Sequence, residues 1–363
     1  MKKIGKIFAL LSLGVLGIVL VLLGLAWITA FKPQAIESVP LLTQGEAPKM
    51  KAGQPLKVLS WNVQFMAGKG YIFFFDMPGN KGPDERPSRS SVEQTLAEVA
   101  RVIQAENPDV IALQEVDDGA ARTDHEDQLA RLQAMLPKEY NQSASAFYWK
   151  VPFVPHPRIL GSVGLKLSIL SRYQISSARS ILLPQAPHPP VVTWFQFHRT
   201  ILEAHFPLQE GGDLVVLNTH GEALIQDGVV KKQEVEFLAN HLQTLSAEHP
   251  WWVLAGDMNM LPPGFYTRIP VAERVWFKPE FDMGALYAKY SALPSLAMLN
   301  SPDSLQYLTH FPNRIGATGL DKVIDYQFYS PVLTVESFHV RQADCLKISD
   351  HMPLVASYLL PIK

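Results

Sequence analysis

The longest apolar stretch of the chain lies near its N-terminus, where residues 7–31 contain no charged side chain. As an α-helix these 25 residues would measure roughly 37 Å, against about 30 Å for the hydrocarbon core of a bilayer. Three lysines precede the stretch and Lys32 follows it. Because cytoplasmic flanks carry the excess of positive charge, the pattern predicts a transmembrane anchor over residues 1–32, with the N-terminus in the cytoplasm and the remaining chain extracytoplasmic.

A cleaved signal peptide is the alternative interpretation of this stretch. The apolar region of a signal peptide is usually about half as long and ends in small residues, whereas Trp27-Ile28-Thr29-Ala30 is a poor cleavage site. We therefore favour an uncleaved anchor. Residues 33–55 are rich in Pro, Gly and Gln and lack periodicity, which predicts a linker between the membrane and a folded domain of residues 56–363.

Short runs of apolar or alternating residues predict many strands after this linker. They cover residues 56–63, 109–115, 143–150, 164–170, 177–183, 191–205, 213–219, 251–257, 323–329, 332–340 and 353–360. Helical spacing is found after a capping box at Ser90 and Glu93, and again over 127–136 and 235–245. Helices and strands alternate early and strands dominate the end, which predicts an α/β fold with two stacked mixed sheets and helices outside.

Composition limits the chemistry that such a domain can use. The chain has 363 residues, of which 47% are hydrophobic, enough for one large folded unit and an appendage. A single cysteine, Cys345, excludes an intrachain disulfide and a cysteine zinc cluster, so any metal must be bound by oxygen and imidazole. Without residues 1–32, which hold four lysines and no acid, the net charge is −2 − 4 = −6. This acidic balance argues against non-specific nucleic-acid binding.

Five predicted strands are followed by carboxylate, amide or imidazole side chains. These residues are Asn62, Glu115, His220, Asp257 with Asn259, and Asp350 with His351. Taken singly, each is typical of the first solvated position of a loop, and Asp-x-Asn is typical of an Asx turn. Side chains two residues apart point the same way in an extended chain. Together the strand ends predict an oxygen-rich pocket at one rim of the sheets.

Seven short blocks carry a resemblance to a known family. They are Leu59-Ser-Trp-Asn62, Leu113-Gln-Glu115, Leu170-Ser-Arg172-Tyr, Leu217-Asn-Thr-His220, Ala255-Gly-Asp-Met-Asn259, Val323-Ile-Asp-Tyr326 and Ser349-Asp-His351. In this order and spacing the chain, from about residue 56 to 360, resembles the endonuclease/exonuclease/phosphatase superfamily, the metal-dependent phosphoesterases related to DNase I and neutral sphingomyelinase. The resemblance implies a four-layer α/β sandwich with two central mixed β-sheets.

The resemblance also implies a metal site. Glu115 is an anion at a strand end, suited to a hard divalent cation with oxygen ligands, and the matching family position binds Mg²⁺ or a similar ion such as Mn²⁺ or Ca²⁺. Asn62 is expected to share this ion or to orient Glu115. Asp350 is expected to be a further ligand.

Five further positions are implied to be catalytic. Asp257 is expected to orient or deprotonate the attacking water, and Asn259 to donate to a phosphate oxygen. Asp325 and His351 are expected to form an orienting pair, in which the carboxylate selects the tautomer of the ring. His220 is expected to supply a second donor. The sequence alone does not tell which histidine is charged.

Three functions remain compatible with the sequence. The first is a membrane-anchored phosphodiesterase or phosphatase acting on phospholipid headgroups or small phosphoesters, in which the apolar run Tyr71–Phe75 either touches lipid or packs on the domain itself. The second is a metal-dependent endo- or exonuclease, which needs a basic stripe such as Lys166, Arg172, Arg199 and Lys231-Lys232. The third is a non-catalytic scaffold, although no catalytic position is visibly substituted. No obligate protein partner is indicated.

Overall fold

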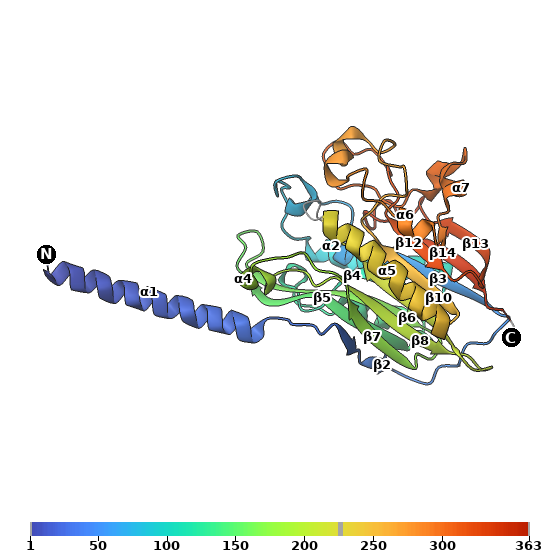
Figure 1. Ribbon diagram of the computed structural model, residues 1–363, viewed down its shortest axis with the longest axis horizontal. Helices are drawn as coiled ribbons and strands as arrows, with labels where there is room; N and C mark the ends of the chain where they lie inside the picture. Colours follow the sequence, from blue (N-terminus) through green and yellow to red (C-terminus); the bar gives the residue numbers. More distant parts are fainter. Residues whose placement is uncertain (1, 224–227, 362–363) are drawn as a thin grey trace.

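The computed structural model describes residues 2–223 and 228–361 (Figure 1). The outermost residues of the predicted anchor and catalytic domain, residue 1 and residues 362–363, lie outside this description, as do residues 224–227. Two mixed sheets form the centre of the described chain. Sheet I consists, in spatial order, of β1 (Ile36–Ser38), β7 (Ser177–Leu182), β8 (Thr200–Pro207), β9 (Asp213–His220), β10 (Trp251–Asp257), β12 (Asp325–Tyr329) and β11 (Ser291–Leu293). Sheet II consists of β13 (Thr334–Val340), β14 (Leu354–Leu359), β3 (Pro55–Asn62), β4 (Val110–Asp117), β6 (Gly161–Ser171), β5 (Gln142–Val154) and β2 (Leu41–Thr43).

The two sheets stack face to face, and helices cover their outer faces. Side chains alternate between the faces of each strand, so Val58 of β3 and Val253 of β10 enter the core between the sheets. Leu59 instead faces α2 (Arg89–Glu106) and α3 (Gln128–Met135), while Leu254 faces α5 (Gly228–Glu248). The order is helices, sheet II, sheet I, helix, which confirms the predicted four-layer α/β sandwich.

Some predicted element boundaries were wrong. The strand predicted over 191–205 begins only at Thr200, and Pro190–Thr193 instead form the short helix α4. Pro189 and Pro190 lack the backbone N–H that a strand ladder requires, so the chain cannot pair there. Helix α2 is capped by Ser88, whose hydroxyl accepts from Ser91 N at 3.2 Å, and not by the predicted capping box. Between β10 and β12 the chain forms β11 and only short helices, including α6 (Gly284–Tyr287) and α7 (Leu296–Leu299).

The segment predicted to be a linker is part of the sandwich. β1 pairs antiparallel with β7, and β2 pairs antiparallel with β5, so this segment adds an edge strand to each sheet. Met50 forms a further bridge to Leu208. An edge strand offers unpaired N–H and C=O groups, and these take up a segment that has no periodicity of its own. The folded unit therefore begins before residue 56, and residues 33–44 are called the strap below.

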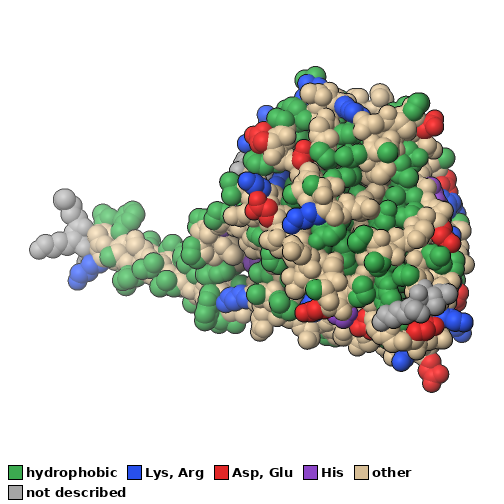
Figure 2. All heavy atoms as spheres, turned by 45° about the vertical axis from the view of Figure 1, so that its right-hand side comes forward, with side chains coloured by type: hydrophobic (Ala, Val, Ile, Leu, Met, Phe, Trp, Pro, Cys, Tyr) green, Lys and Arg blue, Asp and Glu red, His purple; other side chains and the backbone are tan. Residues whose placement is uncertain are grey.

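Helix α1 (Lys2–Thr29) projects from the body of the domain, and apolar side chains surround it (Figure 2). Its segment Ile4–Thr29 has a mean hydropathy of 2.8, and the helix is long and apolar enough to cross a membrane. An N-terminal signal sequence has the same properties. The uncleaved anchor and its orientation therefore stay predictions.

Candidate active site

Strand register aligns three of the predicted residues on sheet I. Asp257 of β10 is the direct partner of His220 on the parallel strand β9 and of Asp325 on the antiparallel strand β12. Asn62, at the end of β3 in sheet II, donates from Nδ2 to Glu115 Oε1 at 3.0 Å and to Asp257 Oδ2 at 3.1 Å. A hydrogen bond therefore joins the rims of the two sheets at the centre of the predicted site.

Glu115 owes its direction to an irregularity of β4. The pairing of β4 with β6 shifts between Leu113 and Val116, and Glu115 between them has a φ of 56°. Such a bulge turns a side chain out of the regular alternation, and strained backbone of this kind often marks a functional site. Burial, together with the charge of Asp350, raises the pKa of Glu115 above its ordinary value. A bound cation would relieve this unfavourable burial of negative charge.

Asp257 lies at a close approach between β9 and β10. A Cβ atom on Gly256 would be 2.0 Å from Thr219 O, so a glycine is needed before the carboxylate. Asn259 N donates to Asp257 Oδ1 at 2.9 Å, which is the Asx turn considered from the sequence. The Asn259 side chain donates to Gly221 O at 3.2 Å. Both interpretations of Asp257 are therefore compatible with the structure. The Asx turn uses Oδ1, whereas Oδ2 faces Asn62, His220 and His351.

The two histidines of the site differ in protonation. Burial lowers the pKa of His351, but the carboxylates of Asp325, Asp257 and Asp350 raise it to about 10. Its Nδ1 lies 2.9 Å from Asp325 Oδ2, and its Nε2 lies 3.5 Å from Asp257 Oδ2. Burial, and then the charges of Arg199 and His351, lower the pKa of His220 well below its ordinary value. At neutral pH His351 is therefore protonated and His220 is neutral.

The two ring nitrogens of His220 face different partners, Tyr148 and Asp257. Tyr148 OH lies 3.1 Å from His220 Nδ1, and His220 Nε2 lies 3.4 Å from Asp257 Oδ2. When the tyrosine donates, Nε2 carries the hydrogen of the neutral ring and faces Asp257. Burial, opposed by the charge of His351, raises the pKa of Asp257 to about 7. One carboxylate thus lies between a charged and a neutral imidazole.

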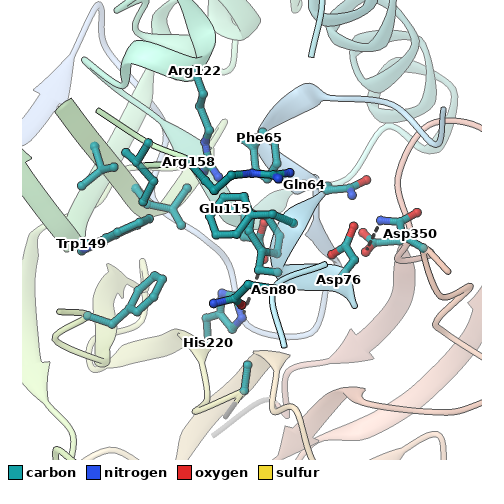
Figure 3. A pocket seen from close by; sticks show the side chains of 18 of the residues that line it. Gln64, Phe65, Asp76, Asn80, Glu115, Arg122, Trp149, Arg158, His220 and Asp350 are labelled. Atoms are coloured by element: carbon teal, nitrogen blue, oxygen red, sulfur yellow. Dashed lines mark hydrogen bonds and ion pairs between the residues drawn. The ribbon is translucent and has the colours of Figure 1, made fainter. Parts of the chain in front are cut away.

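All eight predicted site residues lie in or directly behind the lining of one cleft of about 840 Å³. Figure 3 labels three of them, Glu115, His220 and Asp350. Six of them line it: Glu115, His220, Asp257, Asn259, Asp350 and His351. Asn62 and Asp325 lie behind them and act through hydrogen bonds to Glu115, Asp257 and His351. The lining of the cleft also has an aromatic part that includes Trp149, Phe195 and Phe197.

Asp76 is a carboxylate of this cleft that sequence reasoning missed. Figure 3 shows it beside Asp350, and its Oδ2 accepts from Phe73 N at 2.8 Å. Burial, followed by the charges of Asp350 and Glu115, raises the pKa of Asp76 to about 8. The residue belongs to a long loop without periodic pattern, so no sequence signal identified it.

The same loop contains the apolar run Tyr71–Phe75, for which the sequence left lipid contact and packing on the domain as alternatives. Phe73 is fully buried and Phe74 is 9% exposed, so the hypothesis that the whole run touches lipid is wrong. These two rings pack against the domain and bring Asp76 to the cleft. Phe75 is 41% exposed and lines the cleft.

Of the residues predicted to form a basic stripe, Arg199 lines the cleft, whereas Lys166, Arg172, Lys231 and Lys232 do not. Lys231 Nζ donates to Asn259 O at 3.1 Å, and Lys232 pairs with Glu236. Lys166 Nζ is paired with Asp118 at 2.9 Å and Asp127 at 3.1 Å, and Arg172 bonds to Asn107 and Tyr140 away from the cleft. Other cations line the cleft in ion pairs with acids. These are Arg86 with Asp124, Arg122 with Asp117, Arg158 with Glu85, and Arg314 and Lys322 with Glu273.

Arg199 differs from those paired cations. Its side chain is 5% exposed and lines the cleft, and among the described residues its Nε and Nη1 have no hydrogen-bond partner. Glu222 Oε2 is 3.7 Å from Nε, too far for a hydrogen bond. A buried guanidinium with free donors beside His220 suits an anionic substrate group.

The chain matches the model of the Endonuclease/Exonuclease/phosphatase family over residues 59–351. It belongs to this family. A search of curated proteins finds no match.

Solved structures of other proteins share the fold of this family member. An endonuclease/exonuclease/phosphatase from Beutenbergia cavernae is 22% identical with a TM-score of 0.57, and the match covers 85% of this chain and 72% of that one. The human Nocturnin catalytic domain with bound sulfate is 17% identical with a TM-score of 0.50, covering 88% and 96%. D. rerio TDP2 complexed with a single-strand DNA product is 13% identical with a TM-score of 0.53, covering 84% and 99%. At these identities the likeness extends to the fold alone.

Members of the Endonuclease/Exonuclease/phosphatase family are typically phosphoester hydrolases that depend on a divalent metal, and the donor set of this chain fits such an ion. Carboxylate and amide oxygens of Glu115, Asp350 and Asn62 are hard ligands. Gln64, 3% exposed beside them, has both side-chain amide atoms without a partner among the described residues. Ligand atoms of His310, Asp350 and His351 also lie within 4.8 Å of one another. The cleft thus holds polar atoms that the described chain does not itself satisfy.

Proposed function

We propose that the protein is a divalent-metal-dependent phosphoester hydrolase, anchored to a membrane by α1 with its catalytic domain on the extracytoplasmic side. The observation that carries this proposal is the position of Asp257. Its carboxylate lies within 3.5 Å of His220 and His351 and accepts from Asn62 and Asn259. A purely structural carboxylate would not need one protonated and one neutral histidine beside it in the lining of a cleft.

Glu115 and Asp350 would hold the cation, and Asn62 would either share it or orient Glu115 through its hydrogen bond. Mg²⁺ is the cation proposed, and Mn²⁺ or Ca²⁺ are the alternatives. When bound, the ion would neutralise charge on the phosphate and polarise it toward attack. The raised pKa of Glu115 supports this assignment, because a site that concentrates negative charge without a partner favours a cation.

Asp257 and the side chains around it would then accept or donate the protons that hydrolysis requires. Asp257, with a pKa near neutrality, accepts a proton from the attacking water as the water oxygen bonds to phosphorus. Protonated His351, held by Asp325, donates from Nε2 to a phosphate oxygen. His220 and Asn259 supply further donors to that group. The bond from phosphorus to the leaving oxygen breaks, and that oxygen takes up a proton from solvent.

The substrate proposed is a phospholipid headgroup or a small phosphoester, with a nucleic acid as the alternative. The cations that line the cleft are in ion pairs with acids, and the chain beyond residue 32 carries a net charge of −6. Polyanions gain affinity mainly from many simultaneous phosphate contacts. Rapid degradation of DNA or RNA, with a steep loss of rate as salt rises, would favour the nuclease instead.

The test is hydrolysis of bis(p-nitrophenyl) phosphate by the full-length protein in detergent, with Mg²⁺ or with EDTA. We expect activity only with the metal, and an Asp257→Asn variant should lose about 10³-fold in turnover because the base is removed. Asp213→Asn, at the opposite end of the strand that carries His220, is the matched control and should keep full activity. Activity that survives both EDTA and Asp257→Asn would refute the proposal, and a folded protein without activity would indicate the scaffold.

A further inference from the structure

The catalytic domain is held close to the end of the membrane helix. Helix α1 ends at Thr29, and two residues later the ring of Phe31 packs edge-on against His198, with 5.8 Å between the ring centroids. Two residues span at most about 7 Å. The neighbours of His198, Phe197 and Arg199, line the catalytic cleft. The wall of the cleft therefore lies directly beside the point where the chain would leave a bilayer.

The strap prevents the domain from swinging away from this position. Its carbonyl at Ala35 accepts from Leu182 N at 2.9 Å, and β1 and β2 continue the pairing on both sheets. At the helix end, Lys32 Nζ donates to Trp27 O at 2.8 Å and lies 4.3 Å from the centroid of the indole ring. Trp and Lys are typical of the membrane–water interface. An anchor without a flexible linker fixes which face of the domain meets the membrane.

The mouth of the cleft exposes apolar side chains contributed by three separate segments. Val192 of α4 is 38% exposed, Leu160 between β5 and β6 is 62% exposed, and Phe75 is 41% exposed, and all three line the cleft. Val191 and Phe153, which precede the lining residues Val192 and Val154 in sequence, are 43% and 54% exposed. Figure 1 shows α4 on the side of the domain from which α1 projects. We call these five residues the apolar rim.

We infer that the apolar rim rests on the bilayer that α1 crosses, so that the cleft takes its phosphoester from a lipid of that same membrane; the substrate part of this inference rests on the proposed function. A tethered bilayer is the one apolar partner that the chain itself brings to the rim. The aromatic wall of Trp149, Phe195 and Phe197 then faces the acyl side of the lipid, while Arg199 and the carboxylates face its headgroup. Exposed apolar surface of this kind marks an interaction site.

The position of the rim is tested in proteoliposomes that hold the full-length protein. Leu160→Cys and Val192→Cys are each labelled with an environment-sensitive fluorophore, and Ser337→Cys on β13 is the control. The native Cys345 is fully buried, so it should not be labelled in the folded protein. We expect quenching by nitroxide-bearing lipids at both rim positions and none at Ser337. Equal quenching at rim and control positions, or none at the rim, would overturn the inference whatever the activity of the protein.

Hydrolysis tests the substrate part separately. Val191→Asp and Phe153→Asp lie outside the lining of the cleft, so they should leave hydrolysis of bis(p-nitrophenyl) phosphate unchanged. Losing the burial of one such side chain in lipid should slow hydrolysis of phospholipids in the same vesicles about tenfold. Ser337→Asp should affect neither substrate. An equal loss on both substrates, or no loss on vesicles, contradicts the lipid assignment, whereas inactivity of the unmodified protein on bis(p-nitrophenyl) phosphate contradicts the proposed function.

Discussion

A substitution at Arg199 should lower activity without lowering the free energy of unfolding. Its guanidinium is buried at the cleft, and among the described residues its Nε and Nη1 lack hydrogen-bond partners. Its ion pair with Glu222, at 3.7 Å, is too long for a hydrogen bond and leaves these donors available to an anion. We predict that Arg199→Met, which keeps the length and apolar stem, impairs hydrolysis and anion binding while leaving the fold intact.

The expected effects of Arg199→Met on kcat/KM and on the free energy of unfolding follow from the contacts that the substitution removes and keeps. A hydrogen bond to a charged group contributes about 1.5–3 kcal/mol, so kcat/KM should fall roughly 10- to 150-fold for each bond made to the phosphate. The free energy of unfolding should be unchanged or higher, because a buried cation with free donors is costly. Glu222, 3.7 Å from Arg199, still has the charge of Lys231 nearby.

Arg122 is the matched control, because it lines the same cleft but is fully paired. Its Nε and Nη2 donate to Asp117 at 2.8 and 2.9 Å, and the side chain of Asp117 is 1% exposed. Arg122→Met should therefore lower the free energy of unfolding by about 3–5 kcal/mol. The assays are kcat/KM on a soluble phosphodiester, inhibition by inorganic phosphate, and thermal unfolding. If Arg199→Met unfolds as readily as Arg122→Met while its kcat/KM is retained, the reasoning is refuted.

Three further predictions concern carboxylates. Glu115→Gln should weaken Mg²⁺ binding at least about tenfold by calorimetry, and unchanged affinity would exclude it as a ligand. Since burial and the charges of Asp350 and Glu115 raise the pKa of Asp76 to about 8, cation binding at pH 7 should release a proton that Asp76→Asn does not release, as measured in two buffers of different ionisation heat. Burial alone would raise the pKa of Glu203, but its histidine and arginine partners hold it well below the ordinary value, so its stabilisation is complete above about pH 4.5 and is lost as pH falls further. Glu203→Gln should flatten the dependence of unfolding free energy on pH in that acid range, and an unaltered slope would contradict this assignment.

Local pattern determined the parts of the site that stand directly after strands. Asn62, His220 and Asp257 are the last residues of β3, β9 and β10, and the ends of these strands from the two sheets meet at one rim. His351 was also predicted to follow a strand, which was wrong, because it lies in the loop between β13 and β14. The sequence therefore predicted both the α/β sandwich and the residues of its cleft. It also predicted the long apolar helix near the N-terminus, because residues 7–31 contain no charged side chain.

Residues that act through contacts across the fold were not predictable in this way. Asp76 reaches the cleft because Phe73 and Phe74 pack its loop against the domain, and nothing near it in sequence marks that destination. The strap looked like a linker, because its pairing depends on edge strands that form far away in the chain. Lys166 looked available but is bound by two aspartates from other elements.

The protonation of the two histidines likewise depends on the tertiary structure and not on the sequence pattern. His220 and His351 are the same residue type, and both lie in blocks that resemble the family, so the sequence identified both and distinguished neither. Only the packed structure surrounds His351 with three carboxylates and places the charge of Arg199 near His220. The sequence by itself determined which side chains reach the cleft from strand ends, whereas the tertiary structure decided their protonation, because a pKa depends on burial and on charges brought close by folding.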